Sequence, residues 1–178
     1  MSKNYKKQIF IIVGSASNQS ANQKLVDYLA NLTTDIFNLK IFTNLKTLPH
    51  FDPELSTTNP PQSILDFRET INKADGVIIC TPEYVFSIPS GLKNVIEWCV
   101  STTIFFNKPM GLITASAQGQ KGHEELKLIM KTLGAIFTED TALLIQGIKG
   151  KVNEEGQLID ATTIDVLRLF IKEFKLLL

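Results

Sequence analysis

The chain has 178 residues, of which 44% are hydrophobic and 20% are charged, and its 18 Lys and Arg residues balance its 18 Asp and Glu residues. This length suits one domain with a substantial core, so we expect residues 1–178 to form a single domain. A balanced charge without a strongly basic stretch lacks the electrostatic footprint of nucleic-acid binding, so no nucleic-acid partner is expected.

Short apolar runs lie near the two ends of the chain, and we interpret neither as a signal peptide or a membrane span. Lysines precede the run at residues 9–13, an order that superficially resembles a signal peptide. The run is shorter than the roughly 7 to 15 residues of a signal core and matches the length of one strand. Residues 176–178 are likewise too few to span a bilayer. We therefore expect no membrane segment.

The cysteine content favours a reducing compartment. Cys80 and Cys99 form neither a CxxC pair nor a disulfide framework, which suits the cytoplasm. Because free cysteine is among the most buried residue types, we interpret both as core residues rather than redox groups.

The first predicted strand covers residues 8–13 and is followed by a polar turn, residues 14–22, into a helix with Leu25, Leu29 and Leu32 inward. Ser20 and Gln23 have the spacing of a capping box, which makes Ser20 the predicted N-cap. A helix that begins just after a strand attracts anions through its free amides and its dipole. The same stretch is also compatible with an ordinary capped turn that binds nothing.

The second predicted strand covers residues 35–39, and residues 40–59 are expected to be irregular. His50 in this stretch has no His, Cys or Asp partner at metal-ligand spacing, so we expect a surface histidine and no metal site. A helix follows Pro60 and Pro61. Its predicted inward face comprises Ile64, Phe67, Ile71 and Ala74.

The central predicted strand, residues 77–80, is a run of apolar, mostly β-branched residues between Gly76 and Pro82, typical of a strand buried on both faces. A loop leaves its carboxyl end and enters a helix with Pro89 in the first turn. The expected inward face of that helix comprises Leu92, Val95, Ile96, Cys99 and Val100. Ligands bind at such positions in open α/β sheets.

The last third of the chain repeats the pattern. A strand is predicted at 108–115, a loop at 116–123, and a helix that Gly134 terminates. Its inward face comprises Leu126, Ile129, Met130 and Leu133. A last strand region at 135–145 and a turn or hairpin at 147–156 precede a final helix, capped by Thr162 or Thr163. Its predicted inward residues are Leu167, Phe170, Ile171 and Phe174.

These elements predict an α/β fold. The alternation βαβαβαβαβα requires helices on both faces of a parallel sheet, and five strands favour the doubly wound order 2-1-3-4-5. The chain has no GxGxxG after the first strand and no GxxxxGK[ST], which argues against a classical dinucleotide fold and a P-loop NTPase.

Residues 82–98, PEYVFSIPSGLKNVIEW, resemble the PEYN-x-S-x-P-G-x-L-K-N-x-I-[DE]-W signature of the NADPH-dependent FMN reductase family, which comprises flavodoxin-like quinone, azo-dye and chromate reductases. Residues 14–22 resemble its G-S-x-R-x-x-S-x-N loop and residues 116–122 its S-x-x-G-x-x-G loop. Residues 48–55 resemble its LP-x-[FY]-D-x-[DE]-[LI] segment, which we expect to wall the site or a subunit contact. The resemblance implies a flavodoxin-like three-layer sandwich.

The resemblance also implies a function: an FMN-dependent NAD(P)H oxidoreductase that works by ping-pong turnover. NADPH or NADH is the implied donor, and a quinone, azo compound, metal oxyanion or free flavin is the implied small-molecule acceptor. Because the flavin carries the hydride chemistry, no catalytic side chain is assigned. Family members are commonly homodimers or homotetramers. The residues expected to bind FMN are Gly14, Ser15, Ser17, Ser20, Asn22, Pro82, Glu83, Tyr84, Val85, Ser87 and Ser116.

Two residues depart from the family pattern. Ser17 replaces an Arg that lies by the FMN phosphate, so a charge-assisted contact is lost unless Lys24 or a neighbouring subunit supplies a cation. Val85 replaces an Asn, which puts a polar contact near the ring or substrate in question. Gly14 is expected where the turn needs a positive φ or close approach. Lys93, Glu97 and Glu83 are expected in ion pairs rather than in catalysis.

Two other functions are compatible with these motifs. An electron-transfer flavodoxin also binds FMN, although this chain lacks the strongly acidic balance and Thr-rich phosphate loop of that class. A family member that has lost flavin could persist as a binding or regulatory module, and the residues at positions 17 and 85 motivate this alternative.

Overall fold

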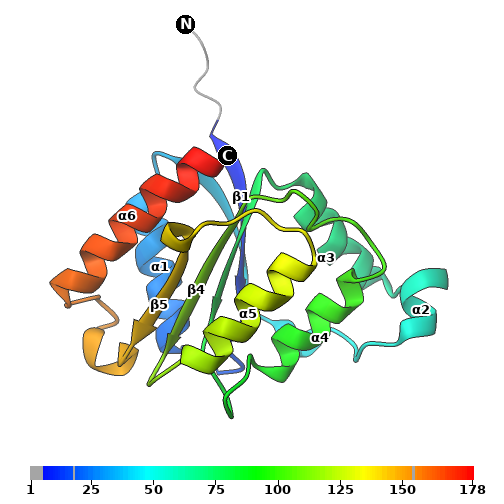
Figure 1. Cartoon of the computed structure of the whole chain (residues 1–178), viewed down its shortest axis with the longest axis horizontal. Coiled ribbons are helices and arrows are strands. Elements are labelled where there is room, and N and C mark those ends of the chain that lie inside the picture. The colour runs from blue at the N-terminus through cyan, green and yellow to red at the C-terminus, as the bar shows by residue number, and fades with distance from the viewer. Residues whose placement is uncertain (1–5, 18, 154) are drawn as a thin grey trace, which may run out of the picture.

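The computed structural model describes residues 6–17, 19–153 and 155–178, which form three layers (Figure 1). All strand pairs are parallel, and the order β2-β1-β3-β4-β5 confirms the predicted order. The strands are β1 (Lys7–Val13), β2 (Phe37–Phe42), β3 (Gly76–Thr81), β4 (Met110–Ser116) and β5 (Ala142–Gln146). Lys3 of the N-terminal lysine cluster and Asn18 of the first turn lie outside the described residues.

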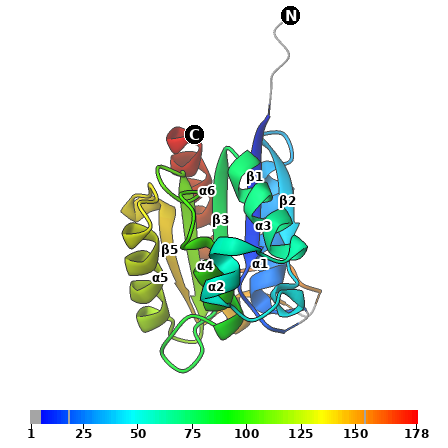
Figure 2. The same cartoon turned by 90° about the vertical axis from the view of Figure 1, so that its right-hand side faces the viewer.

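Helices cover both faces of the sheet (Figures 1 and 2). The α-helices are α1 (Ala21–Thr33), α2 (Pro53–Thr58), α3 (Gln62–Lys73), α4 (Ser90–Cys99), α5 (Gln120–Thr132) and α6 (Ala161–Leu177), and the 3-10 helices are η1 (Leu45–Thr47), η2 (Glu139–Thr141) and η3 (Ile148–Lys151). One core cluster packs α3, α4 and α5 against the sheet, and a second packs α1 and α6 against the other face. No helix of the described residues combines the length and apolarity needed to cross a membrane.

Strand β3 lies at the centre, and all six of its residues are buried. Ile79 belongs to the cluster beneath α3 and α4, whereas Ile78 and Cys80 belong to the cluster beneath α1 and α6. Alternate side chains of a strand point to opposite faces, so a strand covered on both faces is apolar throughout. The predicted doubly buried strand is confirmed.

The second strand and the segment after it differ from the prediction. Strand β2 runs to Phe42 because residues 37–42 pair in parallel with residues 7–12 of β1. The segment expected to be irregular also contains η1 and α2. Asp52 caps α2 by accepting bonds from the amides of Glu54 and Leu55, and Pro53 occupies the first turn. An Asp N-cap followed by Pro is a standard start of a helix, and this pair could have been recognised in the sequence.

Several helix and strand ends also differ. Pro89 is the N-cap of α4 rather than a first-turn residue, and Val100, expected to face inward, is 57% exposed. Asp160 caps α6, which corrects the prediction of Thr162 or Thr163. In the expected strand region 135–145, only β5 forms a strand, and residue 136 makes a single bridge. The third loop is shorter than predicted because α5 begins at residue 120.

A buried cation joins three helices on one side of the sheet. The Arg68 guanidinium of α3 donates to the carbonyl of Trp98 at the end of α4 and to the carbonyl and hydroxyl of Ser56 in α2. It also donates to the Ser101 hydroxyl at 3.0 Å. The carbonyls at a helix C-terminus carry partial negative charge, so they stabilise this cation.

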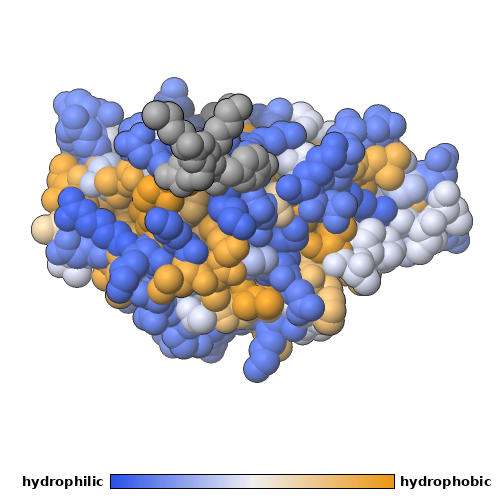
Figure 3. All heavy atoms as spheres, turned by 90° about the horizontal axis from the view of Figure 1, so that it is seen from above, coloured by the Kyte–Doolittle hydropathy of each residue, from blue (hydrophilic) through white to orange (hydrophobic). Residues whose placement is uncertain are grey.

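The edge of the sheet where the strands begin is seen in Figure 3. On the visible face, hydrophobic residues form patches between hydrophilic ones. The cavities described below lie at the opposite edge, where the strands end.

The burial of His123 can be tested through the pH dependence of the free energy of unfolding. This residue of α5 is buried, and its Nδ1 lies 2.9 Å from the Thr114 hydroxyl of β4. Burial holds the pKa of His123 below its ordinary value, and the charge of Lys127 adds to the effect. The unfolded chain takes up a proton near pH 6.5 while the folded chain resists it, so the free energy of unfolding should fall as pH drops from about 7 to 5.

We expect His123→Gln to reduce this loss of stability between pH 7 and 5, measured by urea unfolding at both values. His50 is the only other histidine and is exposed, so His50→Gln is the matched control and should retain the wild-type pH dependence. An identical dependence in wild type and His123→Gln would contradict the assignment.

Candidate functional site

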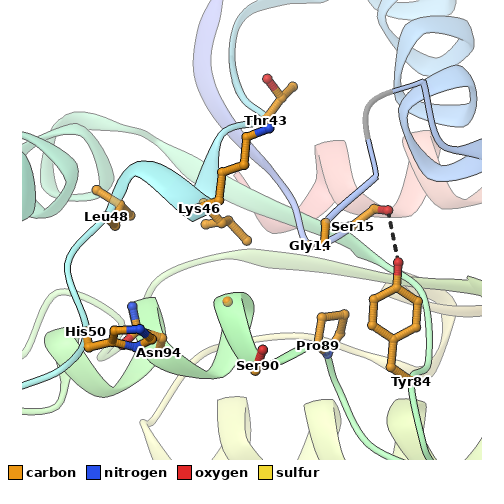
Figure 4. A pocket seen from close by; sticks show the side chains of 13 residues that line it. Gly14, Ser15, Thr43, Lys46, Leu48, His50, Tyr84, Pro89, Ser90 and Asn94 are labelled. Carbon is orange, nitrogen blue, oxygen red and sulfur yellow. Dashed lines mark hydrogen bonds between the residues drawn. The ribbon is translucent and has the colours of Figure 1, made fainter.

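Two adjoining cavities lie where the parallel strands end. The larger cavity, about 750 Å³, is formed by the segments that follow β1, β3, β4 and β5. The smaller cavity, about 370 Å³, lies between residues 14–16, residues 43–50 and the start of α4 (Figure 4). Ser15 and Tyr84 line both cavities. The loops that follow β1, β3 and β4 therefore converge at this edge of the sheet.

The first loop presents hydroxyls and a helix N-terminus to the larger cavity. Ser20 accepts a bond from the Gln23 amide at 3.1 Å, which confirms it as the N-cap of α1. Ser15 is buried and accepts a bond from the Ser17 amide at 3.3 Å. Ser15, Ser17 and Ser20 all line the cavity, and α1 has no acidic residue in its first turn. This end of the cavity is suited to an anion.

Asn22 lines the same cavity but directs its side chain into the protein. Its Nδ2 donates to the carbonyl of Ala115 at 3.0 Å, and its Oδ1 accepts from the Cys80 thiol at 3.4 Å. Because the side chain is buried and bonded to β3 and β4, it fixes the start of α1 relative to the sheet.

Gly14 is required by close approach rather than by a positive φ. A Cβ at this position would lie 2.4 Å from the Thr81 hydroxyl oxygen and 3.0 Å from a methyl of Leu92. A larger residue would therefore separate β1 from β3 and α4. The glycine serves the fold beneath the site, and it borders the smaller cavity.

The loop after β3 closes in a tight two-residue turn. Tyr84 and Ser87 exchange two backbone bonds, at 2.9 and 3.0 Å. Val85 and Phe86 between them have φ of 51° and 61°, as a turn of type I′ requires. Their side chains are 93% and 71% exposed, and neither lines a cavity. The left-handed conformation, which Asn adopts readily, explains why position 85 accommodates Asn in the family signature.

Two carboxylates hold this turn against α5. Glu83 accepts a bond from the Gly122 amide at 2.8 Å and so caps a helix whose own N-cap, Gly119, has no side chain. Glu125 accepts from the Ser87 hydroxyl at 2.6 Å and from the Ile88 amide at 3.0 Å. A Cβ at Gly122 would lie 3.2 Å from Glu83 and 3.3 Å from the Ser87 carbonyl, so glycine permits this approach.

Tyr84 separates the two cavities. The residue is 41% exposed, and its hydroxyl lies 3.4 Å from the Ser15 hydroxyl, which Figure 4 marks with a dashed line. This contact joins the first and second loops across the site.

Part of the segment at residues 48–55, which we expected to wall the site or a subunit contact, borders the smaller cavity. Asn94 accepts from the Phe51 amide at 2.7 Å, and both Asn94 and the Trp98 indole donate to the Pro49 carbonyl at 2.9 Å. Leu48 and the exposed His50 line the cavity (Figure 4). The structure shows no metal-binding group of three His, Cys, Asp or Glu within residues 6–17, 19–153 and 155–178.

The predicted residues divide into three groups. Those around the larger cavity are Ser15, Ser17, Ser20, Asn22, Pro82, Glu83, Tyr84 and Ser116. Gly14 borders the smaller cavity, and Val85 and Ser87 border neither. Lys93 forms an ion pair with Glu97 at 2.6 Å, as predicted, whereas Glu83 bonds to an amide instead.

The segment after β5 also contributes to the larger cavity, which was not predicted. Residues 147–152, including Lys149, line the larger cavity, as does Ala117 after β4. The contribution of this segment could have been predicted, because every loop at the carboxyl edge of a parallel sheet faces the same crevice.

Three comparisons relate this chain to known proteins. Residues 8–149 match the family model described as NADPH-dependent FMN reductase. The chain is 30% identical over 171 residues to the Vibrio ruber NADH:(hydroxy)cinnamate reductase subunit CrdA, which covers 93% of this chain and 84% of that protein. It is 34% identical over 174 residues to a quinone reductase of Pseudomonas putida, covering 93% and 91% of the two chains. The solved structure of FerB, a flavoenzyme NAD(P)H:(acceptor) oxidoreductase from Paracoccus denitrificans, aligns with a TM-score of 0.83 and 26% identity over 95% of each chain.

The carboxylate contacts predict that Glu125 contributes more to the stability of the fold than the adjacent Glu124. Glu125→Ala leaves the Ser87 hydroxyl and the Ile88 amide without their acceptor, so we expect a loss of about 1 to 3 kcal/mol in the free energy of unfolding. Glu124 forms an exposed pair with Lys121, so Glu124→Ala should leave the free energy of unfolding nearly unchanged. Urea unfolding and hydrogen exchange at the Ile88 amide provide the measurement, and equal effects would contradict the assignment.

The turn at Val85 predicts a stabilising substitution. A β-branched residue is strained at φ 51°, so Val85→Asn should raise the free energy of unfolding by about 1 kcal/mol. Val100 is also exposed but has φ −62°, so Val100→Asn should give no such gain in the same thermal or urea unfolding experiment. A loss of stability in Val85→Asn would show that the valine side chain makes a contact worth more than the strain.

Proposed function

The chain belongs to the NADPH-dependent FMN reductase family, and from this premise we propose that it reduces quinone-type acceptors with FMN held in the larger cavity. It is an FMN-dependent NAD(P)H oxidoreductase. The quinone assignment rests on the similarity to the Pseudomonas putida enzyme, whose name states that acceptor. Azo compounds, metal oxyanions and free flavin are the alternative acceptors.

The observation that carries this proposal is the donor set of the larger cavity. One end offers the amides of the α1 N-terminus and the hydroxyls of Ser15, Ser17 and Ser20, which match a phosphate. The other end is lined by residues 82–84 and 115–117, and we propose that it faces the polar edge of a flavin ring. The volume of about 750 Å³ falls within the range of cofactor sites. The residues present therefore fit FMN.

The protein's own residues would bind and orient the reactants. The serine hydroxyls and α1 amides would hold the phosphate, while Pro82 fixes the turn and Tyr84 offers an aromatic surface to a ring. FMN, when bound, supplies the hydride-transfer chemistry between a nicotinamide and an acceptor. We place the nicotinamide ring, and then the acceptor, in the smaller cavity, which shares Ser15 and Tyr84 with the larger one.

Assembly and location are also proposals. The exposure of Val85 and Phe86 beside the cavities supports a homodimer or homotetramer in which these residues meet a neighbouring subunit. Two buried thiols without a disulfide support a cytoplasmic location. The continuous five-stranded sheet that both core clusters share supports a single domain over residues 1–178.

The function is tested by reconstitution. Protein incubated with FMN should acquire a visible flavin spectrum, and NADPH or NADH should bleach it under anaerobic conditions. A quinone added next should restore the spectrum, and initial rates should follow parallel-line kinetics. A protein that stays colourless after reconstitution would instead support a regulatory module, and slow bleaching with fast single-electron exchange would support an electron-transfer role.

A cavity-filling variant locates the site. Ala117 lines the larger cavity and is exposed, so Ala117→Phe should weaken FMN binding by about 10-fold or more without unfolding the protein. Ala161 is exposed at the start of α6 and lines neither of the two cavities, so Ala161→Phe is the matched control. Equal FMN affinity of the two variants in a fluorescence titration would place the cofactor elsewhere.

A further inference from the structure

Lys24 occupies a specific position at the phosphate end of the larger cavity. It follows the first turn of α1, whose N-cap is Ser20, and lines the cavity together with Ser17. Long side chains on a helix lean toward its N-terminus, so a lysine here extends toward the free amides. A cation at this end of a helix is disfavoured by the helix dipole unless an anion binds beside it.

No acidic partner neutralises Lys24 among the described residues. Seven other lysines form ion pairs within 4 Å, and Lys151 of the neighbouring segment pairs with Asp160 at 3.7 Å. Asp27 and Glu155 line a further cavity together with Lys24, yet neither forms an ion pair with it. The carboxylate that does line the cavity, Glu83, already accepts a bond from α5.

The stem of Lys24 rests against a glycine. A Cβ on Gly156 would lie 3.5 Å from Cδ and 3.6 Å from Cε of Lys24, and Gly156 has a φ of 84°. The lysine stem therefore lies close beside the segment after β5, with no side chain of residue 156 between them, and Lys24 is half-buried. Ordering a lysine side chain costs entropy, and this support lowers the further cost of fixing it on a ligand.

We propose that Lys24 provides the positive charge for the terminal phosphate of the flavin cofactor and thereby selects FMN over unphosphorylated riboflavin. This rests on the proposed function, in which FMN occupies the larger cavity. Ser17 stands where the family signature has Arg, so the first loop itself supplies no cation. Lys149 also lines the cavity, but it is exposed to solvent, whereas Lys24 is half-buried, so we assign Lys149 a smaller role.

The test compares two flavins that differ only in the phosphate. The dissociation constants of FMN and riboflavin are measured by flavin fluorescence quenching for the wild-type apoprotein, Lys24→Met, Lys24→Arg and Lys149→Met. Lys24→Met should weaken FMN binding by about 10- to 100-fold, the range of a charge-assisted contact, and leave riboflavin affinity within about twofold. Lys24→Arg should retain FMN affinity, and Lys149→Met should lose less than Lys24→Met.

A second arm uses salt and a compensating charge. Wild-type affinity for FMN should fall as ionic strength rises, and this dependence should be weaker in Lys24→Met. Adding Ser17→Arg to Lys24→Met should restore FMN binding, because the new guanidinium enters the same cavity from the first loop. Riboflavin affinity and thermal unfolding report whether each variant keeps its fold.

The outcomes separate the two proposals. A wild-type protein that binds neither flavin overturns the proposed function and this inference with it. A wild-type protein that binds FMN, together with a Lys24→Met variant that keeps the same ratio of FMN to riboflavin affinity, overturns the role of Lys24 alone. A Lys24→Met variant that loses affinity for both flavins equally shows a structural role and also overturns it.

Discussion

The two carboxylate contacts between the loop after β3 and helix α5 are the constraint on which this edge of the molecule depends. Glu83 reaches from the loop to the helix amide, and Glu125 reaches from the helix back to the loop. Glu83 therefore pairs an amide in the first turn of α5, and Glu125 pairs polar groups of the loop. The same contacts set the position of Tyr84, the wall between the two cavities, and the start of α4 that follows the turn. The shape of the site is thus coupled to the stability of α5.

Much of the fold was predictable because the central strands are encoded locally. Strand β3 is apolar on both faces, so a short run of sequence was enough to place it, and the parallel order followed from the alternation of strands and helices. The edge strand β2 mixes buried and exposed residues and so has no such run. The end of β2 is set by pairing with β1, which residues 37–42 do not reveal alone. The cap of α6 was misplaced because Asp160 and the threonines after it are all good caps.

The location of the site was predictable, whereas the direction of its side chains was not. Parallel strands bring their carboxyl ends to one edge, which places three loops together whatever their residues are. The partner of each side chain is a tertiary property. Asn22 turns inward to a carbonyl 93 residues away, and Ser87 turns to a carboxylate 38 residues away. Val85 points outward because two successive residues of the turn adopt the left-handed conformation. No local sequence pattern predicted that conformation.

The burial of both cysteines has a consequence for the proposed reduction of quinones. Quinones are electrophiles that arylate thiolates, so an oxidoreductase that took them as acceptors would be exposed to attack by its own substrates. Burial raises the pKa of both the Cys80 and the Cys99 thiols, which keeps them protonated and out of contact with solvent. The chain has no other cysteine. The folded protein therefore exposes no cysteine thiol to its reactants. We expect that it is not inactivated by covalent modification of cysteine while it stays folded.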